Sequence, residues 1–421
     1  MVNIRKLALQ AIERIIYKGG YANIVINEYL NKYEFNDEDR RLFTKLVLGT
    51  IEKKLTLSYY LEPYLKKKQK PFVNSLLLMS VYQLVYLNIP EYAVVNESVS
   101  LANMTDRMVG SFVNAVLRNF LRNEIRTLDG LDEVQKLSVK YSYPTWLVAY
   151  LLKDYDYDTV TKIFEFNDEV KSDAIRINTL KSTYDEVIQA LDEEHITYYQ
   201  SDLVNDGLIV HKAMMNHELF KEGKITIQDI ASQMVAEVAA PEEGSLVIDL
   251  CSAPGGKTAH LASWMNNTGT IYACDIHPHK IKLMEKNFKR LGVTNVKTQL
   301  IDAREVHNVV KEESFDYVIA DVPCSGLGVM SHKSDLKYNI TYDAIQEIIK
   351  LQKEILLSSY PLIKKGGYLV VSTCTINKSE NEQQIEYLLS KYPDLKVEYQ
   401  KTILPYEYGT DGFFICKLKK E

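Results

Sequence analysis

The stretch Val247-Ile-Asp-Leu-Cys-Ser-Ala-Pro-Gly-Gly-Lys-Thr258 decides the fold of the larger part of this chain. The apolar run at 246–250, with the single acid Asp249 inside it, is typical of a buried strand. Pro254 and the two glycines after it predict a tight turn, and a helix is expected from Lys257 onward. A strand, a glycine turn and a helix together present backbone N–H groups to a nucleotide-like ligand, and glycine allows that ligand to approach closely.

Two common phosphate-binding motifs are absent from this turn. A Walker A loop would need its first glycine at position 251, which is occupied by Cys251. The dinucleotide-binding fingerprint needs separated glycines, whereas Gly255 and Gly256 are adjacent. From this stretch alone, a purely structural turn remains an alternative.

Four further apolar runs each end in a carboxylate or lead into a thiol. They are 269–275 ending in Asp275, 296–302 ending in Asp302, 315–321 ending in Asp321 before Pro323-Cys324, and 367–373 before Cys374. Any one of these acids would serve as a helix cap. Because ligands of doubly wound sheets bind outside the carboxyl ends of the strands, all five ends predict one site in an α/β sheet.

The order of chemical groups along these strand ends suits S-adenosylmethionine. The glycine turn would surround the methionine end, Asp275 suits the two ribose hydroxyls, and Asp302 suits the exocyclic amine of adenine. The predicted cofactor-binding set is therefore Cys251, Ser252, Ala253, Pro254, Gly255, Gly256, Lys257, Asp275, Asp302 and Asp321.

Three segments resemble one enzyme family. Residues 249–258 (Asp-Leu-Cys-Ser-Ala-Pro-Gly-Gly-Lys-Thr), 321–328 (Asp-Val-Pro-Cys-Ser-Gly-Leu-Gly) and 372–375 (Ser-Thr-Cys-Thr) are similar to the RNA 5-methylcytosine methyltransferases. Within that family the whole chain resembles the RsmB/Sun type, whose members methylate 16S ribosomal RNA and carry a NusB-like domain in front. The resemblance implies a Rossmann-like catalytic domain that methylates carbon 5 of a cytosine with S-adenosylmethionine.

The reaction at carbon 5 gives the two motif cysteines distinct roles. Carbon 5 is a poor nucleophile, and a thiolate that adds to carbon 6 makes it an enamine carbon able to attack a methyl group. The resemblance to RNA enzymes implies that Cys374 is this nucleophile and that Cys324 releases the product, whereas DNA methyltransferases use the Pro-Cys position, here Cys324. Lys257 is placed to favour a thiolate, and Asp321 would hold the target base. The remaining cysteines, Cys251, Cys274 and Cys416, are expected to pack without thiol chemistry.

Composition excludes several other classes of protein. A length of 421 residues suggests two or three domains, and 46% hydrophobic with 25% charged residues is ordinary for a soluble protein. The sequence shows neither an apolar run of the ~20 residues that a membrane helix needs nor a signal-peptide core. Five cysteines without paired spacing indicate a reducing compartment, and His277 and His279 do not share a helix face, so no metal site is expected. We expect a cytoplasmic monomer.

Residues 1–128 are predicted to form an all-α, NusB-like domain that binds RNA. Apolar residues recur at helical spacing from Ile4 to Ile15, and Asn36 is expected to cap a second helix. The net charge of the chain is −6, yet residues 1–130 hold 18 basic and 13 acidic residues, a balance of +5. An RNA surface would therefore be a local basic face, for which 66–70 is one candidate and a plain solvated loop is the alternative.

Residues 129–224 are predicted to form a linker and a small α+β module, and residues 225–421 the methyltransferase domain. The module should contain a strand at 174–178, a helix at 183–193 and a strand at 208–210. The resemblance implies that it helps to form an RNA cleft. Arg176 and Asn178 are candidates facing the RNA, and an edge-strand Arg176 that is merely solvated is the alternative. The stretch 412–418 alternates like an antiparallel strand that closes the edge of the large sheet.

One segment departs from the pattern of the family. Where relatives usually show Arg-Arg-x-Pro-Asp-x-x-Trp after the Pro-Cys loop, this chain has Ser331-His-Lys-Ser-Asp-Leu-Lys-Tyr338. The departure concerns RNA contacts and the choice of target, and it leaves the reaction intact. Our interpretation is a methyltransferase acting on 16S rRNA, either naked or early in assembly. The alternatives are the same chemistry on transfer RNA, or a non-catalytic RNA-binding or antitermination factor.

Overall fold

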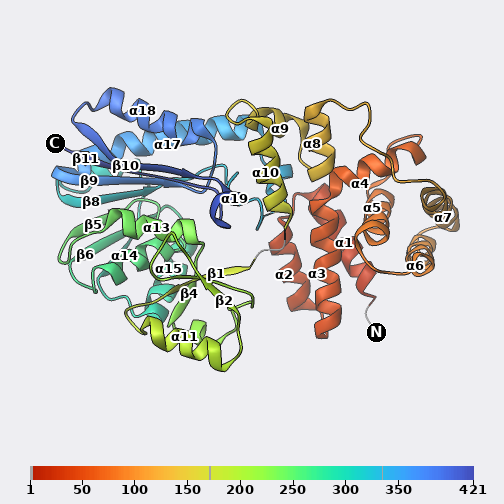
Figure 1. The fold of residues 1–421 in the computed structure, drawn as a ribbon, viewed down its shortest axis with the longest axis horizontal. Helices are drawn as coiled ribbons and strands as arrows, with labels where there is room; N and C mark the ends of the chain where they lie inside the picture. Colours follow the sequence, from red (N-terminus) through yellow and green to blue (C-terminus); the bar gives the residue numbers. More distant parts are fainter. Residues whose placement is uncertain (1–2, 170–171, 334) are drawn as a thin grey trace. The chain divides into compact units, whose positions relative to one another are not determined.

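The computed structural model describes residues 3–169, 172–333 and 335–421. The chain divides into two compact units, one made of Met1–Asp168 with His332–Asn339 and the other of Glu169–Ser331 with Ile340–Glu421. We call them the helical unit and the sheet unit (Figure 1).

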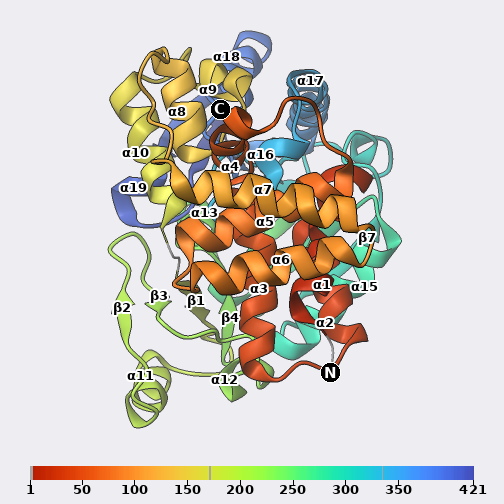
Figure 2. The same ribbon diagram turned by 90° about the vertical axis from the view of Figure 1, so that its right-hand side faces the viewer.

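The helical unit confirms the expected all-α domain. Its buried stripes join in one core that includes Leu46, Leu76 and Leu117, and α5, α6 and α7 lie side by side within it (Figure 2). Its helices are α1 (Ile4–Lys18), α2 (Ala22–Lys32), α3 (Asp37–Glu52), α4 (Lys54–Leu61), η1 (Glu62–Tyr64), α5 (Pro71–Tyr86), α6 (Glu91–Asn103), α7 (Arg107–Arg122), α8 (Glu133–Tyr141), α9 (Thr145–Leu151), α10 (Tyr157–Asp168) and the distant α16 (Leu336–Asn339).

Helix boundaries in this unit follow local chemistry where a capping residue is present. The Asn3 side chain accepts a hydrogen bond from the Lys6 amide at the start of α1. Asn36 does the same for α3. This helix is the third of the chain, so the prediction of a second helix at Asn36 missed α2. The N-cap residue of α2, Tyr21, offers no side-chain cap, which removed the usual sequence signal.

The sheet unit begins with a four-stranded antiparallel sheet in the order β2-β3-β1-β4. The expected strands and helix of the small module are confirmed, and β4 adds a strand beyond residue 224 by pairing with β1. The elements are β1 (Asp173–Ile177), α11 (Tyr184–Glu193), β2 (Tyr198–Gln200), β3 (Gly207–Val210), α12 (Glu218–Lys221) and β4 (Ile225–Ile227).

The prediction that Arg176 and Asn178 face RNA is wrong. Each side chain is 1% exposed. Arg176 Nε donates to Gln228 Oε1 at 2.9 Å, and Asn178 Nδ2 donates to the carbonyls of Gly223 at 2.7 Å and Leu291 at 2.8 Å. The cause is topological, because β1 lies between β3 and β4 rather than at the edge of its sheet. These two residues join the small sheet to the rest of the unit.

The large sheet has seven strands in the order β10-β11-β9-β8-β5-β6-β7. The five strands predicted from the apolar runs, β5 to β9, are present and parallel, so their carboxyl ends meet at one edge. The strands are β5 (Leu246–Asp249), β6 (Thr270–Asp275), β7 (Val296–Leu300), β8 (Phe315–Asp321), β9 (Ile363–Thr373), β10 (Leu395–Ile403) and β11 (Phe413–Lys420).

The final strand is antiparallel as expected, but it does not close the sheet edge. β11 pairs with both β9 and β10, and β10 takes the outer position. The run from Phe413 to Cys416 is buried without alternation. That pattern fits a strand covered on both faces and explains the error.

Helices cover both faces of the large sheet (Figure 1). On one face lie α17 (Tyr342–Ser359) and α18 (Glu382–Lys391), and on the other α13 (Ile230–Ala239), α14 (Gly256–Trp264) and α15 (Pro278–Leu291). Short helices η2 (Val306–Asn308), η3 (Tyr360–Leu362), η4 (Lys378–Glu380) and α19 (Pro405–Tyr408) complete the unit. This is the doubly wound α/β arrangement predicted from the sequence.

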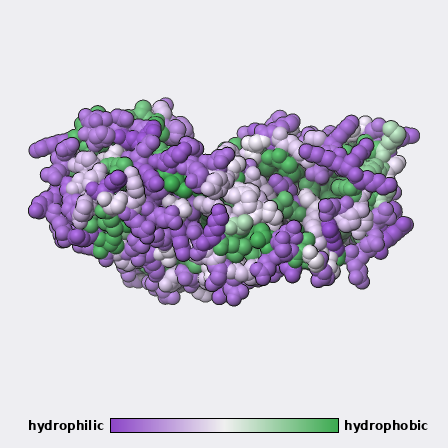
Figure 3. Space-filling view, turned by 90° about the horizontal axis from the view of Figure 1, so that it is seen from above, coloured by the Kyte–Doolittle hydropathy of each residue, from purple (hydrophilic) through white to green (hydrophobic). Residues whose placement is uncertain are grey.

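The face drawn in Figure 3 is mainly hydrophilic, with apolar residues in small groups. Within the described residues, no helix combines the length and the apolarity needed to cross a bilayer.

Candidate active site

Two cavities lie at the edge of the large sheet where the parallel strands end. One, of about 510 Å³, is lined by Asp275, Asp302 and Cys324, and we call it the acidic cavity. The other, of about 260 Å³, is lined by Lys257 and Asp249, and we call it the lysine cavity. All but one of the predicted site residues line at least one of these cavities. Those that line the acidic cavity are Cys251, Ala253, Asp275, Asp302, Asp321, Cys324 and Cys374. Those that line the lysine cavity are Cys251, Ser252, Ala253, Pro254, Gly256, Lys257, Asp321 and Cys374, and Gly255 lines neither cavity.

Gly255 shapes the turn between β5 and α14 instead of lining a cavity. Its φ of 95° is in the left-handed region that favours glycine, and it is the N-cap residue of α14. A Cβ added there would lie 2.9 Å from the ring of Phe288. The turn is held by the Gly255 amide, which donates to the Ser252 carbonyl at 2.7 Å.

Asp249 is a cavity residue that the sequence analysis did not select. It is fully buried at the end of β5, and Thr258 Oγ1 donates to its Oδ2 at 2.6 Å. Burial raises the pKa of Asp249 to about 6, and the hydrogen bond from Thr258 opposes that rise. A signal was present in the sequence, because Asp249 is the lone acid inside an apolar run.

Two carboxylates of the acidic cavity have basic neighbours. Asp275 accepts the His277 amide at 2.9 Å, and Lys280 Nζ lies 3.5 Å from its Oδ2. Asp302 accepts Arg304 Nη2 at 2.7 Å and the Arg304 backbone amide at 2.9 Å. The side-chain hydrogen bonds from Arg304 lower the pKa of Asp302. Arg304 itself lines the cavity and was missed by the sequence analysis, although it lies two residues after a selected acid.

The two motif cysteines lie beside each other: both line the acidic cavity, and Cys374 lines the lysine cavity as well. Cys324 Sγ lies 3.1 Å from Cys374 Sγ, and neither cysteine is in a disulfide. They come together because β8 and β9 are neighbours whose register pairs Asp321 with Ser372. The hydrogen bond with Cys374, together with burial, raises the pKa of the Cys324 thiol well above its usual range.

Lys257 and Asp321 form an ion pair beside the thiols. Lys257 Nζ lies 2.6 Å from Asp321 Oδ2, and Ser372 Oγ donates to Asp321 Oδ1 at 2.7 Å. Burial lowers the pKa of Lys257, but the attraction and hydrogen bond of Asp321 outweigh it and leave the pKa above its usual value. The Cys374 sulfur also acts in this direction, so the ammonium is within electrostatic reach of that thiol.

Buried polar groups from distant parts of the chain hold the Pro-Cys and Thr-Cys segments. Glu380 accepts the Ser325 amide at 2.7 Å, and Gln352 Nε2 donates to the Pro323 carbonyl at 2.9 Å. The Gly328 amide donates to the Cys374 carbonyl at 3.1 Å. A Cβ at Gly328 would lie 1.9 Å from the Gly412 carbonyl oxygen, so only glycine fits. No sequence signal marked Glu380 or Gln352.

The other cysteines are placed in packed surroundings. Burial raises the pKa of Cys274 and Cys416 to about 12 and that of Cys251 above its usual value. Cys251 also lines both cavities. Among the described residues, no group of three or more His, Cys, Asp and Glu side chains could hold a metal ion.

Known families match the chain in three places. The model described as 16S rRNA methyltransferase RsmB/F matches residues 236–419, the NusB family model matches 2–122, and a ferredoxin-like domain model of RsmF/B-like methyltransferases matches 143–216. The chain is 34% identical to the probable ribosomal RNA small subunit methyltransferase B of Bacillus subtilis (strain 168). The matched region covers 100% of this chain and 99% of that relative.

Solved structures show the same similarity. The structure of PH0851 covers 100% of this chain and 99% of its own length, with a TM-score of 0.83 and 27% identity. A methyltransferase homolog protein from Pyrococcus horikoshii covers 70% of this chain and 100% of its own length, with a TM-score of 0.61 and 26% identity.

Proposed function

Because the chain belongs to the family of ribosomal RNA small subunit methyltransferases of the RsmB type, we propose that it methylates carbon 5 of one cytosine in 16S rRNA, with S-adenosylmethionine as methyl donor. The observation that carries this proposal is the pair of thiols, Cys324 and Cys374, 3.1 Å apart at the ends of neighbouring strands. A carbon-5 reaction needs one thiol to activate the base, and a second polar group to help release it.

The acidic cavity fits the proposed cofactor. Its volume of about 510 Å³ is in the range of small-molecule sites. Asp275 is 7% exposed and offers carboxylate oxygens for ribose hydroxyls. Asp302, which is held by Arg304, lines the same cavity and would also accept from the adenine amine. Cys251 and Ala253 of the turn at 251–257 line this cavity, so the turn would meet the other end of the ligand. When bound, S-adenosylmethionine would supply an electrophilic methyl group.

We assign the nucleophilic role to Cys374. Its thiolate would add to carbon 6 of the cytosine, so that the electron pair of the 5,6 double bond becomes available at carbon 5. The nearby Lys257 ammonium supports this assignment, because a positive charge favours a thiolate over a thiol. The raised pKa of Cys324 supports it too, since that thiol keeps its proton more readily.

Asp321 and Cys324 take the remaining roles in our proposal. Asp321 borders both cavities and would bind the amine or the ring nitrogen of the target base, held in place by Lys257 and Ser372. After methyl transfer, the carbon-5 proton must leave and the bond between carbon 6 and Cys374 must break. Cys324 would relay that proton: its sulfur accepts the carbon-5 proton as the thiol's own proton passes to solvent, which returns the electron pair to the ring and expels the Cys374 thiolate.

RNA binding is proposed for two surfaces. The first is the helical unit, where residues 66–70 carry exposed lysines. The second is a groove of about 860 Å³ between the small sheet and α15, lined by Phe220, Lys286 and Arg290 among others. It shares Ile227 and Pro254 with the lysine cavity. Cations suit phosphates and an aromatic ring suits a stacked base, so nucleotides beside the target would lie there.

Several finer points belong to the same proposal. The functional division is 1–128 for RNA binding, 129–224 for the linker and module, and 225–421 for catalysis. The substrate is naked or early-assembly 16S rRNA, bound by a monomer in the cytoplasm, where ribosomal RNA is assembled. Methylation of transfer RNA is the second candidate, and it shares every site residue named above.

Mapping of the modified base tests the proposal directly. RNA from cells that lack the protein should lose one 5-methylcytosine in 16S rRNA by bisulfite sequencing. The purified protein with methyl-labelled cofactor should restore it on that RNA. Loss from a transfer RNA instead would transfer the proposal to the second candidate, and an unchanged pattern in both RNAs would refute it.

A further inference from the structure

A short segment leaves the sheet unit and becomes part of the helical unit. Residues 332–339 belong to the helical unit, whereas the chain up to Ser331 and from Ile340 onward belongs to the sheet unit. We call residues 332–339 the strap. It lies in the region where the sequence departs from the family pattern for RNA contacts, and its described side chains point to a different role.

Asp335 of the strap caps a helix far away in the sequence. The first amide of α2, that of Ala22, donates to Asp335 Oδ2 at 2.9 Å. Tyr21, the residue before it, gives no side-chain cap of its own. A carboxylate at a helix N-terminus satisfies a free amide and is favoured by the helix dipole. Asp335 is only 7% exposed, so this contact is inside the unit rather than on its surface.

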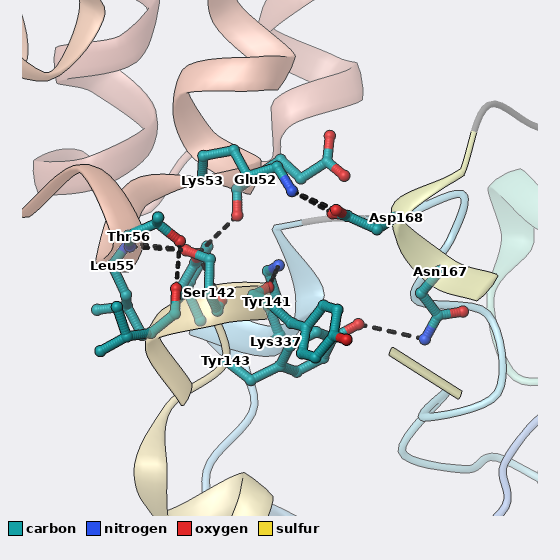
Figure 4. Close-up of polar contacts among 12 residues, drawn as sticks. Glu52, Lys53, Leu55, Thr56, Tyr141, Ser142, Tyr143, Asn167, Asp168 and Lys337 are labelled. Atoms are coloured by element: carbon teal, nitrogen blue, oxygen red, sulfur yellow. Dashed lines mark hydrogen bonds and ion pairs between the residues drawn. The ribbon is translucent and has the colours of Figure 1, made fainter. Parts of the chain in front are cut away.

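Two further strap residues are held among α3, α8 and the turn after α8. Lys337 is 3% exposed; its Nζ donates to the Tyr141 carbonyl at 3.2 Å and lies 4.3 Å from the centroid of the Tyr143 ring. Figure 4 shows Lys337 beside these two residues. The Tyr338 hydroxyl lies 2.8 Å from the carbonyl oxygen of Ser142 and 3.0 Å from that of Glu52.

Both ends of the strap continue into elements that hold the Pro-Cys segment. On its N-terminal side is the Cys324 loop, residues 324–331, where Gly328 is hydrogen-bonded to the Cys374 carbonyl. On its C-terminal side Thr341 caps α17, and Gln352 of α17 donates to the Pro323 carbonyl. Asp335 follows Gly328 by seven positions, and such a length spans at most about 25 Å even when fully extended.

We propose that the strap makes the helical unit a positioning element for the Cys324 loop. Three strap side chains, all buried or half-buried, are bound by the rest of the helical unit. The backbone on either side of the strap continues, within a few residues, into elements that bind the carbonyl groups of Pro323 and Cys374. Weakening the contacts between the strap and the helical unit therefore increases the mobility of the Cys324 loop. The proposal concerns positioning, because no strap residue lines either cavity among the described residues.

Amide hydrogen exchange on the full-length protein, without RNA or cofactor, tests the connection. Tyr338→Phe removes one hydroxyl and keeps the ring. Exchange should rise about two- to tenfold in residues 326–331, the range expected from the loss of one hydrogen-bonded hydroxyl. Exchange in α14 should stay unchanged, because none of the strap contacts described above reaches that helix. Asp335→Ala, which removes the acceptor of the Ala22 amide, provides a second variant with an independent contact, and should Tyr338→Phe fail to fold, it carries the test.

Tyr59→Phe is the matched control. The Tyr59 hydroxyl donates to the Thr127 carbonyl at 2.7 Å in the same unit, so the control loses a similar bond away from the strap. It should leave exchange in residues 326–331 unchanged. An increase confined to residues 335–339 in Tyr338→Phe would overturn the proposal. An equal increase in the control, or throughout the sheet unit, would overturn it as well.

A second measurement rests on the proposed reaction. In a single turnover, Tyr338→Phe should still form the adduct through Cys374, whereas repeated turnover should slow two- to tenfold and the adduct should persist longer, because release depends on Cys324. If exchange in residues 326–331 rose but the rate of repeated turnover stayed unchanged, the positioning role would be overturned. If the native protein formed no adduct, the proposed function would fail, and the exchange experiment would still decide the strap.

Discussion

Replacing Asp249 by asparagine should stabilise the folded protein at neutral pH and lower its activity. The carboxyl group is fully buried, and burial raises its pKa from 3.8 to about 6. Between these two pH values the folded state holds a proton that the unfolded state has released, so the free energy of unfolding falls as pH rises. Above pH 6 the charged, buried carboxylate costs about 3 kcal/mol relative to its neutral form.

Asparagine is neutral, has the same size and can still accept the hydrogen bond from Thr258. The Asp249→Asn protein should therefore match the native protein near pH 4 and exceed its free energy of unfolding by about 1–3 kcal/mol at pH 7. Activity should fall, because Asp249 lines the lysine cavity beside Cys251 and Lys257.

Urea unfolding from pH 4.5 to 8 measures the difference. Trp264 on α14 reports on the sheet unit by fluorescence once Trp146 has been replaced by phenylalanine in both proteins. The exposed Asp202→Asn serves as the control and should follow the native pH dependence. Parallel curves for the native and Asp249→Asn proteins across this range would refute the reasoning.

The remaining predictions concern catalysis and binding. Cys374→Ala should form no covalent RNA adduct, whereas Cys324→Ala should accumulate one that survives a denaturing gel; the reverse pattern would reassign the nucleophile. Asp275→Ala should weaken S-adenosylmethionine binding by roughly 1.5–3 kcal/mol, the value of charged hydrogen bonds, and unchanged calorimetric affinity would remove Asp275 from the cofactor site. Glutamine in place of the lysines in 66–70 should flatten the salt dependence of RNA binding by roughly 0.7–0.9 in log–log slope per lost phosphate contact, and an unchanged slope would make this a solvated loop.

Part of the candidate site could be located from the sequence because parallel strands end at one edge. An apolar run followed by Asp275, Asp321 or Cys374 identifies both a strand and the polar group at its carboxyl end. Once the runs are taken as one parallel sheet, these groups must lie near one another, whatever the details of packing. The turn before α14 could also be predicted from the sequence, because few residues other than glycine adopt the left-handed conformation found at Gly255.

The tertiary structure alone decided which distant groups hold that site. Glu380 and Gln352 lie far along the chain from the Ser325 amide and the Pro323 carbonyl that they bind, and their surroundings in the sequence carry no motif. From the sequence, Arg176 was expected on an edge strand, whereas the strand order places β1 in the middle of its sheet. The strap is the clearest case, because nothing near Asp335 indicates that it caps a helix beginning at Ala22. Periodicity and local motifs predict which side chains are buried and where an element ends. Which distant residue a side chain binds is decided by long-range packing.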